Sequence, residues 1–186
     1  MSASIYLATR NPGKLMAANS VFGKYGITLR SVEKDYPEIQ DETSLAIAKF
    51  TALQVARDLN SPAIREDHSL FIEALGIPGP YTNYIEKKIA APKLAELIKL
   101  IGNNKGYFEV ATVYAEPDGK TFESVFQVPM TFGEKIKGEN PKGWNGLIRL
   151  LDEKRAITEY PEEERLYIWN QGYEKIAEFI ALQKRL

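Results

Sequence analysis

The chain has 186 residues, of which 44% are hydrophobic and 26% are charged, so its composition is that of a folded globular protein rather than a disordered or fibrous one. Its 24 Lys and Arg and 25 Asp and Glu leave a formal charge of −1, which removes the usual electrostatic basis for binding a nucleic-acid polymer or a membrane surface. The absence of cysteine excludes disulfides, thiol nucleophiles and cysteine-ligated metals, and a single histidine argues against a His-rich metal site or a Ser-His-Asp triad. The groups that remain for an active site are carboxylates, lysines and the backbone.

No segment resembles a targeting or membrane-spanning sequence. The apolar stretch at residues 4–8 is too short for the core of a signal peptide and is followed by Arg10. No run of the sequence approaches the ~18 apolar residues that cross a bilayer. We therefore expect a cytoplasmic protein with no membrane partner.

Predicted strands and helices alternate in the first part of the chain. The compact apolar run at residues 5–9 stops at Asn11-Pro12-Gly13, which indicates a buried strand that feeds a turn. Pro12 suits the first turn of a helix whose apolar residues recur every three or four positions until Gly23. The elements that follow are a strand at 27–32, a polar loop at 33–41, a helix that begins at Thr43 or Ser44 and continues to Leu59, and a strand that begins at 62–64.

The rest of the chain is less regular. Two prolines and two glycines at residues 76–81 predict a turn-rich loop, and helical spacing returns over 84–101 with an interruption near Pro92. Alternating stretches at 107–114 and 121–132 predict a hairpin. The clearest apolar stripe predicts a last helix and consists of Trp169, Tyr173, Ile176, Ala177 and Ile180. This order of elements predicts an α/β fold with a mixed sheet.

The first candidate site is the predicted turn from strand to helix at residues 9–14. Unpaired N–H groups at a helix start attract anions, Gly13 permits close approach of a phosphate, and Lys14 adds a full positive charge. The segment is therefore suited to a phosphate chain. The alternative is a simple Asn-Pro-Gly turn in which Lys14 is solvated.

The second candidate is a set of carboxylates. Glu38 lies in the polar loop, and Glu66 and Asp67 arrive together at the end of a predicted strand. Ligands of open α/β sheets bind at the carboxyl ends of strands, and Mg²⁺ prefers oxygen ligands, so these acids suit a magnesium site. The alternative is that they are solvated loop residues.

In combination these motifs resemble the inosine triphosphate pyrophosphatase family, which hydrolyses non-standard purine nucleoside triphosphates to monophosphate and pyrophosphate. The family's Thr-x-Asn-x-x-Lys is present as Thr9, Asn11 and Lys14. Three further family motifs follow in the family's order, at residues 37–40, 66–71 and 76–81. The resemblance covers essentially the whole chain.

The resemblance implies a single nucleoside triphosphate pyrophosphatase-like domain over residues 1–186, with an elongated mixed-sheet fold of two lobes around a central cleft, and a homodimer. By position, Thr9, Asn11 and Lys14 would hold the triphosphate of the substrate, Glu38 and Asp67 would bind Mg²⁺, and Asp67 would activate the attacking water. Lys14 would add electrostatic stabilisation of the developing charge.

The second half of the chain departs from the family at its recognition residues. The family's stacking aromatic is replaced by Lys142, and its base-reading aspartate is replaced by Asn145. A family lysine keeps its charge as Arg165, whereas the family's His-Arg pair aligns with Asn170 and Gln171. In addition, a lysine of the family's second helix aligns with Thr51, and a small polar residue aligns with His68.

Two interpretations of these departures stay open. In one, the base specificity is altered: Asn145, Asn170 and Gln171 donate and accept hydrogen bonds, and Trp144 offers a stacking face. In the other, base recognition has been lost and Asn170 and Gln171 merely flank a core residue. His68 could bind a phosphate or assist proton transfer, or be a structurally paired side chain.

The leading functional hypothesis is a Mg²⁺-dependent nucleoside triphosphate pyrophosphatase. The main alternative is a non-catalytic member of the same family that binds nucleotide or dimerises without turnover. A third hypothesis is the hydrolysis of another phosphorylated small molecule.

Overall fold

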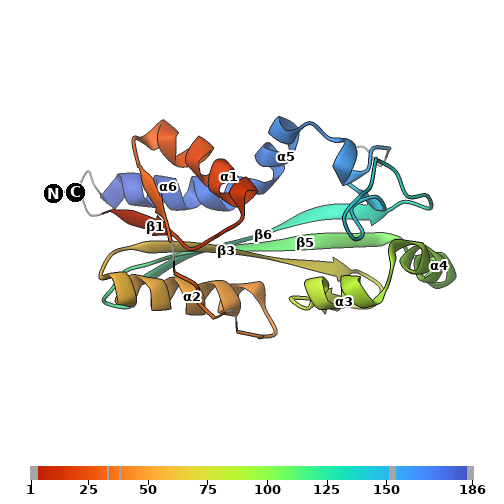
Figure 1. The fold of residues 1–186 in the computed structure, drawn as a ribbon, viewed down its shortest axis with the longest axis horizontal. Coiled ribbons are helices and arrows are strands. Elements are labelled where there is room, and N and C mark those ends of the chain that lie inside the picture. The colour runs from red at the N-terminus through yellow and green to blue at the C-terminus, as the bar shows by residue number, and fades with distance from the viewer. Residues whose placement is uncertain (1–3, 33, 38, 151–153, 184–186) are drawn as a thin grey trace. The chain divides into compact units, whose positions relative to one another are not determined.

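A computed structural model describes most of the chain (Figure 1). The described residues are 4–32, 34–37, 39–150 and 154–183. The chain folds into two compact units. The first unit comprises residues 1–67, 110–126 and 166–186, and the second comprises 68–109 and 127–165.

The described residues form a mixed α/β fold. The strands are β1 (Ile5–Leu7), β2 (Leu29–Ser31), β3 (Ala63–Ile72), β4 (Ile77–Gly79), β5 (Lys105–Ala115), β6 (Thr121–Phe132) and β7 (Ile148–Arg149). The α-helices are α1 (Pro12–Phe22), α2 (Ser44–Leu59), α3 (Thr82–Lys88), α4 (Ala91–Ile101), α5 (Glu162–Trp169) and α6 (Gln171–Gln183). Within the described residues, none of these helices combines the length and the apolar character needed to cross a bilayer.

One mixed sheet contains the described strands in the order β2-β1-β3-β5-β6-β7, with β4 paired to β3. Strand β1 is parallel to both β2 and β3, whereas β4 is antiparallel to β3 and β7 is antiparallel to β6. The predicted α/β class and the predicted mixed sheet are therefore confirmed.

Helices cover both faces of the sheet in the first unit. Figure 1 shows α1 beside α6 on one face and α2 on the opposite face. Ile64 and Tyr114 pack in the core with α1 and α6, whereas Ala63 and Val113 pack in the core with α2. Successive side chains of a strand point to opposite faces, so a strand that is covered on both faces, such as β3, supplies both cores.

Helix α2 is held close to the sheet by small side chains. Ala48, Ala52 and Ala56 recur every four residues, and each is completely buried. The Thr43 side chain caps the helix by accepting a hydrogen bond from the backbone N–H of Ala46 at 3.1 Å. The predicted start of this helix is thus confirmed.

The second unit differs from the sequence prediction at two points. The turn-rich loop at 76–81 contains the short strand β4, because its backbone pairs with β3 in register Phe71 with Pro78. The helical spacing over 84–101 forms two helices, and the interruption that was predicted near Pro92 lies at Ile89 and Ala90. Pro92 does not interrupt a helix but lies in the first turn of α4, where its missing N–H loses no hydrogen bond.

The predicted last helix is also divided. Trp169 ends α5, which the periodicity did not predict, and α6 begins at Gln171 after the single residue Asn170. The backbone N–H of Asn170 donates to Leu166 and its carbonyl accepts from Glu174. The hydrogen bonds therefore pass through the junction, and an apolar stripe can continue across it without one continuous helix.

Candidate functional site

The turn between β1 and α1 is shaped by the side chains of the Thr-x-Asn motif. The Thr9 hydroxyl oxygen accepts a hydrogen bond from the Asn11 backbone N–H at 3.1 Å. Asn11 is the N-cap of α1, and its Oδ1 accepts from the N–H groups of Gly13 and Lys14 at 2.9 and 3.4 Å. The helix start is therefore pre-organised by two side chains, and the Thr9 O–H hydrogen stays available as a donor.

Lys14 is held inside the first unit. Its Nζ donates to the backbone carbonyl of Glu66 at 3.1 Å and lies 3.5 Å from the Glu66 Oε1. The side chain of Lys14 is 22% exposed and that of Glu66 is 2% exposed. The alternative of a freely solvated Lys14 is therefore wrong for this structure, because a buried carboxylate fixes the position of the ammonium group.

The same carboxylate lies near a buried tyrosine of α6. Burial, followed by the charge of Glu66, raises the pKa of Tyr173 well above its ordinary value. The hydroxyl is therefore neutral at physiological pH and can donate to the carboxylate. Glu66, which lies near this tyrosine, in turn holds Lys14.

Asp67, the residue after Glu66, lies on the opposite side of β3 from Glu66. Its Oδ2 accepts a hydrogen bond at 2.9 Å from the hydroxyl of Ser44, the buried first residue of α2. An anion is stabilised beside a helix N-terminus, which fits this position. Glu66 instead contacts Lys14 and Tyr173.

Glu66 and Asp67, which the sequence analysis grouped as candidates for a magnesium site, therefore contact different partners. Adjacent residues of a strand point to opposite faces, so the two acids serve different surroundings. Glu38, the other predicted metal ligand, lies outside the described residues. In the described ranges, no group of three His, Cys, Asp or Glu side chains is placed to hold a metal ion. Because Mg²⁺ in phosphoryl-transfer sites uses one or two carboxylates together with water and substrate phosphates, Asp67 still fits part of such a site.

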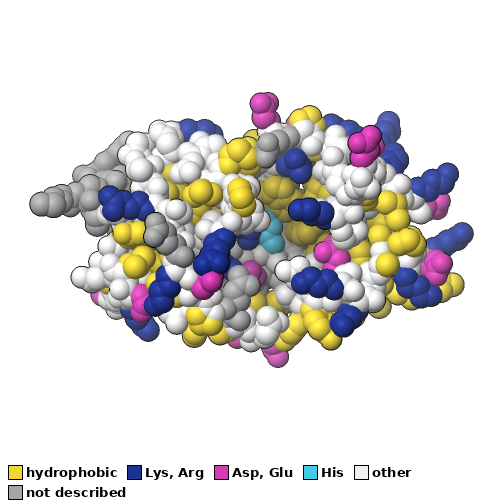
Figure 2. All heavy atoms as spheres, viewed as in Figure 1, with side chains coloured by type: hydrophobic (Ala, Val, Ile, Leu, Met, Phe, Trp, Pro, Cys, Tyr) yellow, Lys and Arg dark blue, Asp and Glu magenta, His cyan; other side chains and the backbone are white. Residues whose placement is uncertain are grey.

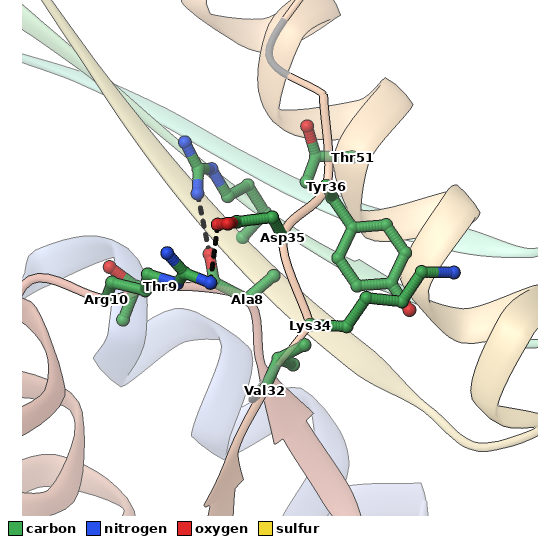
Figure 3. Close-up of a pocket in the computed structure, with 9 residues that line it drawn as sticks. Ala8, Thr9, Arg10, Val32, Lys34, Asp35, Tyr36 and Thr51 are labelled. Carbon is green, nitrogen blue, oxygen red and sulfur yellow. Dashed lines mark hydrogen bonds and ion pairs between the residues drawn. The ribbon is translucent and has the colours of Figure 1, made fainter.

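A cavity of about 120 Å³ lies beside this turn, within the first unit (Figure 3). Its walls come from the segments that follow the carboxyl ends of β1 and β2, from α2 and from β3. Figure 3 shows Arg10 and Asp35 pointing toward one another, and their ion pair measures 2.7 Å. Thr51, which stands where the family resemblance expects a lysine, is part of the wall.

Trp144 is placed differently from the prediction. Its side chain is completely buried in the second unit, its indole N–H donates to the carbonyl of Ile89 at 2.7 Å, and its backbone N–H donates to Glu86 Oε1 at 2.7 Å. A ring with no exposed face cannot stack on a base. The structure therefore does not support the predicted stacking role and gives Trp144 a packing role instead.

The other predicted base-side residues lie in both units. In the second unit Lys142 is exposed, whereas His68, Asn145 and Arg165 are half-buried. In the first unit Asn170 is buried and donates to the Ser20 hydroxyl at 3.3 Å, and the exposed Gln171 donates to the Ile168 carbonyl at 3.4 Å. Asn170 therefore has at least a structural role, and the substrate-binding roles of these residues stay predictions.

Charges of both signs are interspersed on the face shown in Figure 2, without a large patch of either sign. This matches the formal charge of −1. Attraction of an anionic ligand must therefore be local, which directs attention to the turn, Lys14 and the cavity.

Three residues with a place in this arrangement were not predicted: Ser44, Arg65 and Tyr173. Ser44 was considered only as a helix cap, and Tyr173 only as part of an apolar stripe. Arg65 carried a usable signal, because a charged residue inside an otherwise apolar strand start is unusual unless the charge is bound or functional.

The chain is similar in sequence to one known family and to named members of it. The model of the Ham1 family matches residues 5–172. A protein from Methanopyrus kandleri named dITP/XTP pyrophosphatase is 32% identical over 178 residues, which cover 94% of this chain and 95% of that protein. A second dITP/XTP pyrophosphatase, from Thermococcus kodakarensis, is 29% identical over 88% of this chain and 89% of that protein.

The fold also matches solved structures. The Ham1 protein of Coxiella burnetii superposes with a TM-score of 0.77 at 20% identity, covering 96% of this chain and 98% of that one. The Ham1 protein of Staphylococcus aureus gives a TM-score of 0.76 at 19% identity, covering 97% and 99% of the two chains. At these identities the match establishes the shared fold.

Proposed function

The chain belongs to the Ham1 family, and we propose that it hydrolyses nucleoside triphosphates, including non-standard purine nucleotides, to nucleoside monophosphate and pyrophosphate. The observation that carries the proposal is that Lys14 and Asp67, to which the family resemblance gives catalytic roles, are each held in place by a residue of another element. Glu66 fixes the lysine beside a capped helix start, and Ser44 fixes the aspartate that follows Glu66 in β3. The name of the relatives, dITP/XTP pyrophosphatase, supports the same reaction.

The helix start and Lys14 bind the triphosphate. Thr9 and Asn11 shape the turn by accepting hydrogen bonds from the N–H groups of Asn11, Gly13 and Lys14, and the positive end of the α1 dipole attracts an anion. The ammonium group of Lys14 adds a full charge in partly dry surroundings, where electrostatic stabilisation of a phosphoryl transition state is stronger than in water.

Asp67 accepts the proton of the attacking water. The Ser44 hydroxyl holds one of its carboxylate oxygens, which orients the other for this task. Water adds to phosphorus, the α–β anhydride bond breaks, and pyrophosphate and nucleoside monophosphate are the two products. Asp67 then returns the proton to solvent.

We propose Mg²⁺ as the cofactor, held by Asp67 and by Glu38. When bound, the ion neutralises phosphate charge and orients the reacting water. We further propose that the protein acts as a homodimer in the cytoplasm. Light scattering coupled to size-exclusion chromatography tests the dimer, for which the expected mass is twice the 21.0 kDa of the chain.

The function is tested by turnover of a nucleotide panel with Mg²⁺, in wild type and in Asp67→Asn. The wild type is expected to release pyrophosphate from at least inosine or xanthosine triphosphate. Asp67→Asn removes the base while it keeps the shape, so activity should fall at least about 100-fold with an unchanged circular dichroism spectrum. The matched control is Asp118→Asn, because Asp118 is an exposed turn residue paired with Lys120 at 2.9 Å.

The same experiment separates the alternatives. Nucleotide-induced thermal stabilisation without turnover would favour the non-catalytic binder. Turnover of other phosphorylated small molecules, with none of nucleotides, would favour the third hypothesis. Full activity of Asp67→Asn would remove Asp67 from the mechanism.

A further inference from the structure

We infer that Arg65, together with Thr51, binds a phosphoryl group of the substrate in the cavity beside the turn between β1 and α1. This assignment rests on the proposed function for the identity of the substrate. It adds two binding residues that the proposed mechanism does not use.

The cavity has the size of a subsite rather than of a complete nucleotide pocket. Its volume is about 120 Å³, whereas pockets that enclose a drug-sized ligand measure roughly 300–1,000 Å³. It can therefore take one charged group and some water. It adjoins the phosphate-binding turn directly, because Thr9 and Arg10 are part of its wall.

Three cationic side chains, those of Arg10, Lys34 and Arg65, line the cavity and differ in their exposure. Arg10 pairs with Asp35 at 2.7 Å, with side chains 62% and 77% exposed, and Lys34 pairs with Asp58 at 2.8 Å. Such exposed pairs contribute little to stability or binding. Arg65 is half-buried, and its Nη1 donates to the neutral carbonyl of Ala8 at 2.7 Å.

The position of Arg65 follows from the register of the sheet. Leu7 of β1 is opposite Ile64 of β3, and the Ala8 N–H donates to the Ile64 carbonyl at 2.8 Å. Strand β1 ends here while β3 continues, so the next residue of β3 lies where β1 gives way to the turn. The bond to Ala8 fixes the guanidinium, whose planar set of five N–H donors suits the oxygens of a phosphate.

Thr51 is the independent sign of a ligand. Its side chain is 2% exposed, and within the described part of the chain its Oγ1 has no hydrogen-bond partner. A buried hydroxyl without a partner is destabilising, so native proteins rarely keep one without a use. Thr51 lies on the same buried face of α2 as Ser44, the residue that holds Asp67.

The donors around the cavity thus come from three elements. Thr9, at the end of β1, already accepts one hydrogen bond and can donate its own hydrogen. Thr51 comes from α2, and Arg65 comes from β3. A group that only accepts hydrogen bonds and carries negative charge can accept from all three, and a phosphoryl group of a nucleoside triphosphate is such a group.

The first test measures binding of inorganic tripolyphosphate by isothermal titration calorimetry. Arg65→Gln removes the charge and keeps a side chain of similar shape, so the affinity should fall about 10- to 100-fold. Thr51→Lys in the Arg65→Gln background returns a cation to the same cavity from α2 and should recover part of the loss. Arg30→Gln is the matched control, because Arg30 is an exposed strand arginine that is not part of the cavity wall.

The second test uses Thr51→Val, which removes the hydroxyl and keeps the shape. The affinity for tripolyphosphate should fall about 3- to 10-fold. The unliganded variant should be at least as stable as wild type in urea, because a buried donor without a partner has been removed. A purely structural hydroxyl would give the opposite result: lower stability and unchanged affinity.

The outcomes also distinguish this inference from the proposed function. Unchanged affinity in Arg65→Gln, with wild-type turnover of nucleotides, overturns the inference and leaves the function intact. Loss of tripolyphosphate affinity in Arg65→Gln, with no nucleotide turnover by the wild type, supports the subsite and contradicts the function.

Discussion

Asn11 combines a structural contact with the proposed binding of phosphate. Its Oδ1 caps α1, so Asn11→Ala should lower the free energy of unfolding by about 1 kcal/mol, measured in urea. Asn11→Asp keeps the cap acceptor but places a negative charge at the anion site. This variant should therefore be as stable as wild type and have a raised KM for nucleotide.

Asn11→Ser provides the control, since serine caps a helix about as well as asparagine without adding charge. It should leave stability close to that of wild type and raise KM less than Asn11→Asp does. An Asn11→Asp variant with the wild-type KM would show that Asn11 acts only as a cap.

Tyr173 predicts a specific pH dependence of stability. Burial and the negative charge of Glu66 raise the pKa of this tyrosine in the folded state, whereas an unfolded tyrosine ionises near pH 10. The folded state therefore keeps its proton when the unfolded state has lost it. The stability that Tyr173 contributes is complete below pH 10 and is lost as the pH rises above 10.

Phenylalanine cannot ionise, so Tyr173→Phe should lose less stability between pH 8 and pH 11 than wild type does. The difference between the two slopes is at most about 1.4 kcal/mol per pH unit. Urea unfolding at a series of pH values measures it. Parallel curves for the two proteins would contradict the assignment of a raised pKa to Tyr173.

At the scale of elements, the packing of α6 against β5 depends on a glycine. A Cβ on Gly172 would overlap the side chain of Thr112, which is completely buried. Gly172→Ala should therefore destabilise the protein by about 1–3 kcal/mol in urea. Shortening the neighbour with Thr112→Ala should recover part of this loss, because it removes the overlapping atoms.

Gly23→Ala is the matched control for this substitution. Gly23 has helical backbone angles, and nothing lies within 4 Å of an added Cβ. Alanine should be neutral or stabilise by about 0.4–1 kcal/mol, because it restricts the unfolded chain. Equal effects of the two substitutions would contradict the close approach of α6 to β5.

Sequence reasoning predicted the elements whose signals are local. The cap and proline of α1, the apolar face of α2 and the alternation of β5 and β6 are all visible in the sequence. It did not predict strand β4, because its pairing with β3 is a long-range contact in a segment dominated by turn residues. It also did not separate α5 from α6, because the apolar stripe continues across Asn170.

In the site, too, sequence reasoning recognised only residues that lie close together in the chain. Thr9, Asn11 and Lys14 were recognised as a group because they lie within one turn of the chain. The partners that fix them were not recognised, since Lys14 and Glu66 are 52 residues apart and Ser44 and Asp67 are 23 apart. Trp144 was given a ligand role because a motif alignment cannot report burial.

At the scale of the whole molecule, the near-neutral net charge is consistent with a cationic site that attracts anions only locally. A protein with formal charge −1 and mixed surface charges has no long-range attraction for anions. The proposed binding of a triphosphate then depends on Lys14, the start of α1 and the cavity wall at Arg65. The departures from the family at Lys142, Asn145, Asn170 and Gln171 leave Thr9, Asn11 and Lys14 in place, so the proposed reaction is defined by the bond that breaks rather than by the base.

Identification of the products by ³¹P nuclear magnetic resonance tests that reaction most directly. Purified wild-type protein is incubated with inosine triphosphate and Mg²⁺, and the spectrum is followed with time. The account predicts equal amounts of nucleoside monophosphate and pyrophosphate, and no such signals with Asp67→Asn. Nucleoside diphosphate with inorganic phosphate, or an unchanged triphosphate spectrum across the whole nucleotide panel, would contradict it.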